Sequence, residues 1–482
     1  MMEAFSDIYS FIAILVVVYC IIQFFDTIFK TCMFYPYLIM MNNFGIVIKP
    51  YMMVWRITRL NKAFKSMGQC MPSLLKKWFN IGFYLSFISM FVAFGLLVMP
   101  VIRHISGQFV SNDGKEAVIS VIPGITTPFH HIIYIVPALI VSVIFHEFGH
   151  ALAASREKVP VESCGFALAL ILPVAFVNLD YRRMSICSSK QQLRVYCAGV
   201  WHNLVLLLLS LFFVNYAPSV LYPHYQTDVG VTVLNVEKQS SLAHFGGLTK
   251  GDVVSSINNC EVRNIGSWFN CLVETSLSPP MGFCSSKKFI KDYGNISHSC
   301  INSSDHLFFK IFTDEVNNFI CLPARKAIDE ATFCRNNSDC LEKLCLMPVL
   351  STNQEKVIKV KRNFQKSVLF IGSVDEFFLV KTSSWVSDVK FPSIELITHL
   401  ENFFKYLAGI CGGLIIMNVI PCYFLDGGHI IEHLLDYTYR FFKQNLCLKR
   451  KTYLATRFKI VGLVLLVVNI LLGLKNLKVI NL

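Results

Sequence analysis

The sequence predicts a multi-span α-helical membrane protein that is interrupted by one long polar region of mainly β structure. Hydrophobic residues make up 54% of the 482 residues and charged residues only 16%. Apolar segments long enough to cross a bilayer recur before residue 218 and after residue 395. Between these points the apolar segments are short, alternating and separated by turn-forming residues. We therefore divide the chain into residues 1–77, an anchor and a basic membrane-associated loop; 78–217, a membrane core; 218–400, a polar domain; and 401–482, a second membrane core.

The charge of the chain is concentrated in loops beside the apolar segments. The formal net charge is +13, from 44 basic and 31 acidic residues. One cluster lies within residues 30–77 and another within residues 440–459. Basic clusters beside membrane spans usually face the cytoplasm and lipid headgroups. Because no basic soluble domain is present, the composition argues against a nucleic-acid partner.

The expected spans follow in chain order, separated by segments of other kinds. We expect Ile8–Phe29 to be the first anchor and Tyr35–Val54 to be an interfacial or strand-like stretch, because Asn, Gly and Pro interrupt it. Residues 106–127 are expected to form an exposed loop. Cys164–Val177 is too short to cross and contains Pro173, which favours a re-entrant hairpin. The remaining expected spans are Trp78–Val101, His131–Ala154, Leu193–Tyr216, Phe403–Phe424 and a short last one, Ile460–Leu474.

A His-Glu-x-x-His motif lies at residues 146–150, in the expected span His131–Ala154. On a helix, His146 and His150 are four residues apart and project from one face. Two neutral imidazoles in this arrangement can bind one zinc ion, and Glu147 is placed to act on a water at the metal without being a ligand. Ionisable residues in an apolar segment are costly unless they are paired or bound to metal. The motif therefore predicts a metal site close to one membrane face, because Arg156-Glu157-Lys158 follows it.

A carboxylate that can complete the site occurs in a later apolar segment, in Asn418-Val-Ile-Pro421-Cys-Tyr-Phe-Leu425-Asp426-Gly-Gly. Catalytic zinc normally takes three protein ligands, and Asp426 supplies a third. Pro421 lacks a backbone donor and opens the helix, while Gly427 and Gly428 allow close backbone approach. His202 and His429 are alternative ligands, but their positions favour interfacial or hydrogen-bonded roles. Asn203 needs buried partners for its amide.

The polar region begins with a pattern that resembles the middle of a PDZ domain. Val229–Val236 alternates like a strand, Ser240–Leu248 is expected to form a short helix, and Lys250-Gly-Asp252 leads into a strand that ends at Ile257. Val368–Ile371 and Phe377–Val380 are expected to complete the sheet. Such folds bind peptides by adding a strand to a sheet edge. A small β domain that only spaces the two membrane parts is the alternative.

Cysteines and glycosylation sequons are concentrated in the same region. Eight of the 17 cysteines lie here, which suggests disulfides in an oxidising compartment, although free thiols or a zinc cluster remain alternatives. Three acceptor asparagines are candidates for glycosylation, Asn295, Asn302 and Asn336. We therefore expect a lumenal or extracellular PDZ-like domain with a Cys-rich insertion over residues 260–345.

The two motifs and the PDZ-like region between them resemble the site-2 protease family of intramembrane zinc metalloproteases. The resemblance implies one zinc ion per chain held by His146, His150 and Asp426, with Glu147 as general base. It also implies supporting or substrate-orienting roles for Asn203, Asn418 and Pro421.

The same resemblance implies the biological setting. The expected membrane is that of the Golgi or the endoplasmic reticulum, with the active site near its cytoplasmic face. The expected substrates are single-span transcription factor precursors, of sterol-regulatory or stress-response type. They are cut after a prior lumenal cleavage, which releases a cytoplasmic fragment. Two other classes remain open, a catalytically dead membrane scaffold that binds peptides and a zinc transporter.

Overall fold

The structure is a computed structural model that describes residues 2–480, apart from 51, 107–130, 170–171, 223, 245, 295–305, 313–316, 330, 353, 364, 388–391 and 442–447. The chain forms two compact units. Unit 1 comprises Met1–Val214 and Asn402–Leu482, and unit 2 comprises Asn215–Glu401. The loop expected over residues 106–127 lies almost wholly outside the described residues.

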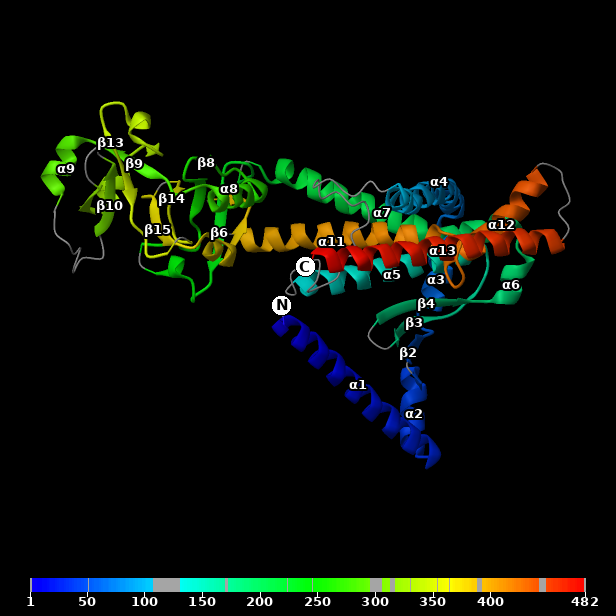
Figure 1. The fold of residues 1–482 in the computed structure, drawn as a ribbon. Coiled ribbons are helices and arrows are strands. Elements are labelled where there is room, and N and C mark those ends of the chain that lie inside the picture. Colours follow the sequence, from blue (N-terminus) through cyan, green and yellow to red (C-terminus); the bar gives the residue numbers. More distant parts are fainter. Residues whose placement is uncertain are drawn as a thin grey trace. The chain divides into compact units, whose positions relative to one another are not determined.

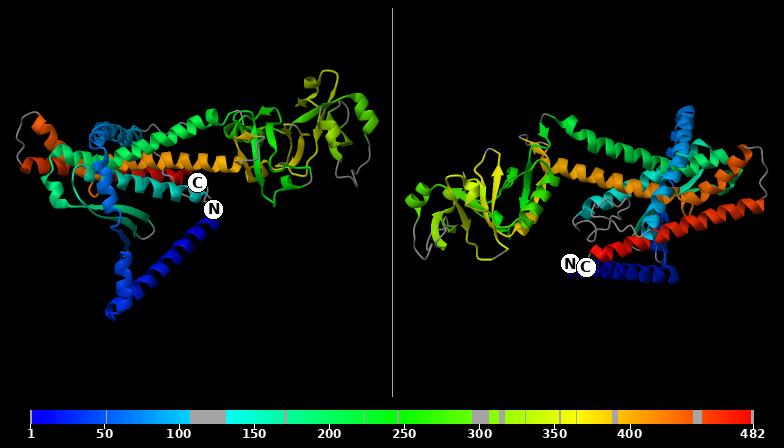
Figure 2. Two further views of the ribbon diagram at one scale, coloured as in Figure 1. Left: turned by 180° about the vertical axis from the view of Figure 1, so that it is seen from behind. Right: turned by 45° about the horizontal axis from the view of Figure 1, so that its top comes forward.

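Five of the described helices are long and apolar enough to cross a membrane, which confirms the expected multi-span class. They are α4 (Pro72–Ile105), α5 (Ile132–Arg156), α7 (Ser189–Leu221), α11 (Ile394–Val419) and α13 (Leu448–Ile480). A sixth is added if the end of α1 (Met2–Thr31) and α2 (Tyr35–Phe44), which meet at a bend of 119°, are one broken span. Figure 2 shows α7 and α11 side by side. The rings of Phe213 in α7 and Phe404 in α11 are 4.2 Å apart between their centroids.

Two expected spans near the C-terminus are present, but their bounds differ from those expected. The span expected over Phe403–Phe424 ends at Val419, because Pro421 cannot donate a helical hydrogen bond. A separate amphipathic helix, α12 (Asp426–Phe441), then begins at Asp426. The last span was expected to be short, over Ile460–Leu474, but α13 has 33 residues because its basic first turns continue the same helix beyond the apolar stretch.

A four-stranded antiparallel sheet belongs to unit 1, in the order β1-β2-β3-β4. Its strands are β1 (Ile46–Lys49), β2 (Met52–Ile57), β3 (Val161–Ala169) and β4 (Leu172–Leu179). The apolar stretch 164–177 therefore forms a hairpin, as expected, and its re-entry into the membrane stays a prediction. The stretch 35–54 is strand-like only from Ile46, because Tyr35–Phe44 forms α2. β4 and the short helix α3 (Asn61–Cys70) pack against α5, and α6 (Tyr181–Ile186) follows the hairpin.

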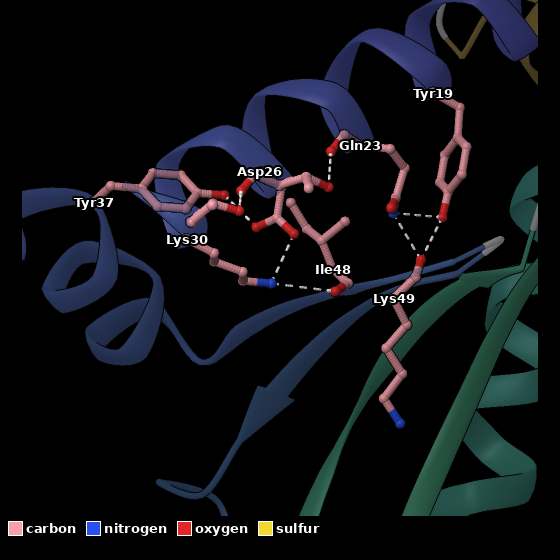
Figure 3. Close-up of polar contacts among 9 residues, drawn as sticks. Tyr19, Gln23, Asp26, Lys30, Tyr37, Ile48 and Lys49 are labelled. Atoms are coloured by element: carbon pink, nitrogen blue, oxygen red, sulfur yellow. Dashed lines mark hydrogen bonds and ion pairs between the residues drawn. The ribbon is translucent and has the colours of Figure 1, made fainter. Parts of the chain in front are cut away.

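Polar side chains of α1 contact the edge strand β1 (Figure 3). Tyr19 Oη and Gln23 Nε2 donate to the backbone oxygen of Lys49 at 2.6 and 2.8 Å. Asp26 is buried, pairs with Lys30 at 2.7 Å and accepts a hydrogen bond from Tyr37 Oη of α2 at 2.7 Å. These bonds satisfy backbone oxygens that an edge strand leaves unpaired, and they satisfy the buried carboxylate of Asp26.

Unit 2 contains a first sheet in the order β15-β14-β7-β6-β16, with β8 paired to β7. Its strands are β6 (Val231–Val236), β7 (Val253–Ile257), β8 (Cys260–Glu261), β14 (Lys356–Arg362), β15 (Val368–Gly372) and β16 (Val380–Ser383). Helix α8 (Ile265–Leu277) places Trp268 in the core of this sheet together with Phe377. Part of the expected insertion thus packs into this first core, through Val262, Trp268, Cys271 and Leu272.

A second sheet in unit 2 has the order β11-β10-β13-β9-β12 and its own core. The strands are β9 (Gly282–Ser285), β10 (His306–Phe312), β11 (Asn317–Pro323), β12 (Phe333–Cys334) and β13 (Leu344–Pro348). Helices α9 (Lys287–Tyr293) and α10 (Ala324–Ile328) and the 3₁₀ turn η3 (Asn337–Cys340) accompany it. The short strands β5 (Tyr225–Gln226) and β17 (Val386–Ser387) pair separately. Figure 1 labels β9, β10 and β13 of this second sheet and β6, β14 and β15 of the first.

Two local expectations for this unit were wrong. The helix expected over Ser240–Leu248 is only the 3₁₀ turn η2 (Ser241–Ala243), held by Ser240, whose hydroxyl accepts from the Leu242 amide. The strand expected over Phe377–Val380 is mostly the 3₁₀ segment η4 (Val374–Leu379), because Ser373 caps it and Phe377 turns into the core.

The expected disulfides are present in unit 2. They join Cys260 to Cys271, Cys284 to Cys340 and Cys334 to Cys345, and Cys321 is also disulfide-bonded. The disulfides Cys284–Cys340 and Cys334–Cys345 lie side by side, so their four sulfur atoms are close together. Because these sulfurs are paired in disulfides, they are not free to act as zinc ligands. All cysteines described as free lie in unit 1.

Candidate metal centre

Three side chains from two helices converge in unit 1. His146 and His150 project from α5, and Asp426 begins α12. Their Nε2 atoms lie 3.1 Å apart, and each is 3.0 Å from Asp426 Oδ2. Both histidines are at least nine-tenths buried. The structure thus brings together the three residues that the sequence predicted as metal ligands.

The first turn of α12 positions Asp426 by close backbone packing. A Cβ atom on Gly427 would lie 2.1 Å from the Ile420 oxygen, and one on Gly428 would lie 2.3 Å from the Cys422 oxygen. Glycine therefore lets the start of α12 lie directly on the segment that contains Pro421. An acid in the first helical turn is also favoured by the helix dipole.

Gly199 of α7 keeps the space in front of the imidazoles open. A Cβ atom on this residue would lie 2.4 Å from His150 Nε2 and 2.6 Å from His146 Nε2. The space left by the missing side chain of Gly199 thus lies where the Nε2 lone pairs of both imidazoles point. Sequence reasoning missed this role of Gly199, although its spacing of four from Asn203 could have placed both residues on one helix face.

The hydrogen bond of His150 fixes which of its nitrogens is free. His150 Nδ1 lies 2.8 Å from the Val195 carbonyl oxygen, which can only accept, so Nδ1 carries the proton. A neutral imidazole then presents its lone pair at Nε2, toward the other two donors. Sequence reasoning could not find Val195, because a backbone carbonyl leaves no signal in residue type.

Asn203 contacts the second imidazole from α7. Its side chain is fully buried, its Nδ2 lies 3.2 Å from His146 Nδ1, and its Oδ1 has no hydrogen-bond partner among the described residues. A half-turn of the amide exchanges nitrogen and oxygen in the same space. It places the oxygen where it accepts from His146 Nδ1–H, which leaves His146 Nε2 free as a donor to metal.

The donor set fits a zinc ion. Ligand atoms about 2.0–2.1 Å from a tetrahedral zinc ion are about 3.3 Å from one another, close to the separations found here. Two imidazole lone pairs and a carboxylate facing one another at such distances repel unless a cation or a proton lies between them. A set of three protein ligands with space beside them is that of a catalytic zinc site.

Glu147 lies beside this group on α5 and is half-buried. Its carboxylate interacts electrostatically with His146, His150 and Asp426, and with the backbone of Val177 in β4. The carboxylate is therefore near both the donor set and strand β4.

The other predicted residues do not join the metal donors. His202 Nδ1 donates to the Ala198 oxygen at 2.8 Å within α7, and His429 is exposed and stacks on Tyr196. Asn418 lies in the last turn of α11 and makes no side-chain hydrogen bond to any residue that the structure describes, and buried Pro421 follows the helix. Asn336 is exposed, whereas Asn295 and Asn302 lie outside the described residues.

The membrane helices and this donor set define an integral membrane protein with a metallopeptidase-type centre. The family model described as "Peptidase family M50" matches residues 134–477, well over half of the chain. The chain therefore belongs to peptidase family M50, a family of zinc metalloproteases.

A relative supports the same assignment. The "Membrane-bound transcription factor site-2 protease homolog" of Arabidopsis thaliana is 31% identical over 213 residues. The alignment covers 44% of this chain and 40% of that relative, so less than half of the relative's length is matched.

Proposed function

We propose that the protein is an intramembrane zinc metalloprotease that cleaves a transmembrane helix of membrane-anchored transcription factor precursors and releases their cytoplasmic fragment. The observation that supports it most is the convergence of His146, His150 and Asp426 beside Glu147. A zinc transporter has no need of an acid next to the first histidine. We take the substrate class, membrane-anchored transcription factor precursors, from the name of the Arabidopsis thaliana relative.

The chain's own residues account for the proton transfers of peptide hydrolysis. A zinc ion, when bound, supplies Lewis acidity toward a water molecule and the peptide carbonyl. Glu147 accepts the proton of the attacking water and passes it to the leaving amine nitrogen. Asn203 and the Val195 carbonyl hold the two imidazoles in the tautomer that faces the site.

A substrate helix must unwind before its carbonyl can be attacked, because its backbone groups are hydrogen-bonded. We therefore expect Pro, Gly or Asn near the cleaved bond. Unit 2 is a folded insertion between the spans α7 and α11, and we propose that it excludes substrates with bulky lumenal domains. Such exclusion makes a prior lumenal cut a requirement.

Cysteine chemistry and basic residues support the proposed topology. Disulfides occur in unit 2, and the free thiols described all lie in unit 1, which favours a lumenal unit 2 in the Golgi or endoplasmic reticulum. Basic residues gather at the ends of α4, α5 and α7, which favours a cytoplasmic position for that side and for the nearby metal centre. We further propose that the sheet containing β6 and β7 is PDZ-like and that Asn295, Asn302 and Asn336 are glycosylated.

The test is cleavage of a membrane-anchored transcription factor precursor already trimmed on its lumenal side. Glu147→Gln and Asp426→Asn should both abolish the cytoplasmic fragment, with metal content retained in the first variant and reduced in the second. Glu162→Gln, an exposed acid of β3, is the matched control and should cleave normally. Full cleavage by Glu147→Gln would remove the protease function and favour the scaffold, or the transporter if zinc flux into vesicles is observed.

A further inference from the structure

A polar hollow of about 400 Å³ lies where the ends of α4, α5 and α7 meet in unit 1. Four basic side chains line it, Lys76, Arg156, Lys190 and Arg194, and one acidic side chain, Glu157. None of these residues belongs to the metal centre. The lining therefore carries a formal charge of +3, from four positive groups and one negative group.

The single acid of the hollow is already neutralised. Glu157 and Arg194 are both more than nine-tenths buried, and Arg194 Nε lies 2.8 Å from Glu157 Oε1. The second carboxylate oxygen accepts a hydrogen bond from Gln191 Nε2 at 3.0 Å. This buried pair forms a fixed wall of the hollow and leaves the other three cations without a counter-charge.

Those three cations come from three different helices and converge on one space. The amines of Lys76 and Lys190 make no hydrogen bond or ion pair with any described residue. Arg156 uses only its Nε, which donates to the Pro72 oxygen at 2.6 Å, so its terminal nitrogens remain available. Cations held together in this way repel one another, and an anion placed between them removes that repulsion.

The position of the hollow indicates which class of anion would fit it. The apolar parts of α4, α5 and α7 begin directly beyond it, and Trp78, an interfacial residue type, follows Lys76 and Lys77. Groups at this level of a membrane protein meet lipid phosphates and the adjoining water.

We propose that this hollow binds a phosphate group, from an anionic lipid headgroup or from a soluble phosphate compound. Lys76, Lys190 and Arg156 contact the phosphate oxygens, and the Glu157–Arg194 pair holds the ends of α5 and α7 in place around them. An acidic peptide segment would match the charge, but the location at the bilayer surface and the size of the space favour the phosphate. The proposal does not depend on proteolysis.

Binding is measured on the full-length, delipidated chain in neutral detergent by titration with dioctanoyl phosphatidic acid, phosphatidylcholine and inorganic phosphate at physiological salt. The test variant is Lys76→Ala/Lys190→Ala, and the matched control is Lys62→Ala/Lys65→Ala, two exposed lysines of α3 outside the hollow. Because neither lysine of the test pair has a structural partner, the fold should survive, and retained metal content checks this. We expect phosphatidic acid affinity to fall by about tenfold or more in the test variant and to change by less than about twofold in the control.

The outcomes separate the sources of the phosphate. Binding of phosphatidic acid that millimolar inorganic phosphate does not displace supports a lipid ligand, whereas equal binding of inorganic phosphate, lost in the same variant, supports a soluble one. Equal affinity of wild type and Lys76→Ala/Lys190→Ala for both phosphates overturns the proposal. Equal losses of phosphatidic acid affinity in both lysine pairs would show general charge attraction and would also overturn the proposal. The proposal would likewise be overturned if a polyglutamate peptide bound in the hollow and neither phosphate compound did.

Discussion

His150 Nδ1 donates a hydrogen bond to the backbone oxygen of Val195, 2.8 Å away on the neighbouring helix. The bond joins α5 to α7 at the metal centre and fixes the tautomer of one donor. The Nδ1 atom of His146 also has a hydrogen-bond partner on α7, but this partner is a side chain, the amide of Asn203 at 3.2 Å. The Asn203 side chain can therefore be removed by mutation, whereas the backbone oxygen of Val195 cannot.

Replacement of Asn203 by alanine should weaken zinc binding by about 10- to 100-fold, the usual effect of losing a group that orients a ligand. The cause is that His146 becomes free to turn and to change tautomer, whereas His150 stays fixed. The measurement is zinc affinity by competition with a chromophoric chelator on purified protein.

The matched control for this change is Asn469→Ala in α13, which removes another intramembrane amide that bonds to the Leu97 and Leu465 oxygens away from the site. Its zinc affinity should equal that of wild type. An unchanged affinity in Asn203→Ala would show that packing alone holds His146.

Replacement of Gly199 by alanine should remove most of the bound metal. The added methyl group would lie within 2.6 Å of both imidazole Nε2 atoms, in the space that the donors surround. Metal content per chain, measured by mass spectrometry of the metal, reports the loss directly.

Gly95→Ala provides the comparison, since this glycine of α4 has no atom within 4 Å of its added Cβ. That variant should keep its metal and gain up to about 1 kcal/mol of helix stability. Full metal content in Gly199→Ala would mean that the ion sits elsewhere.

The sequence predicted the metal donors because each has a signal in residue type. Two histidines at helical spacing and an acid in an apolar stretch are rare and costly, so His146, His150 and Asp426 could be paired without coordinates. The local structure around Asp426 was harder to predict from the sequence. It starts a new helix after Pro421, and the glycines that follow bring it onto the preceding backbone, a contact that depends on tertiary packing.

Elements with short or mixed patterns were harder to predict. The apolar run at 164–177 gave a hairpin by its length alone, yet its pairing with β2, more than a hundred residues earlier, has no local signal. The stretch at Ser240–Leu248 looks helical, but Ser240 and Ser241 bond to Glu376, far along the chain, and only one 3₁₀ turn forms. In these places long-range contacts decide the structure.

Removal of the Cys260–Cys271 disulfide by a double serine substitution should destabilise unit 2 by about 2–3 kcal/mol. The bond closes a short loop of 11 residues in sequence separation, and loop-closure entropy gives a gain of this size. It also ties α8, with Trp268, to the first sheet. Resistance of unit 2 to limited proteolysis in the intact chain should fall, whereas Cys187→Ser, at a free thiol of unit 1, should leave it unchanged. Equal resistance in all three proteins would contradict a stabilising role.

The bonds between Glu376 and η2 should make this part of unit 2 sensitive to acid. One oxygen of Glu376 accepts from Ser240 Oγ, Ser241 Oγ and the Ser241 amide at 2.9, 2.6 and 2.7 Å. Burial alone raises the pKa of Glu376, but these hydrogen bonds outweigh it, and the pKa lies below its ordinary value. A lowered pKa in the folded state means that the stabilisation is fully present above the unfolded pKa of about 4.3 and is lost as the pH falls through the folded value.

Glu376→Gln should therefore reduce the hydrogen-exchange protection of the Ser241–Ala243 amides at neutral pH by the equivalent of about 1 kcal/mol. The difference from wild type should shrink at acidic pH, once the pH falls below the lowered pKa of Glu376 and the wild-type carboxylate also becomes protonated. Glu261→Gln is the comparison, because this exposed carboxylate of the same sheet pairs only with Arg263 and does not touch η2. A Glu376→Gln effect of the same size at neutral and acidic pH would show that side-chain shape, and not the carboxylate charge, holds the turn.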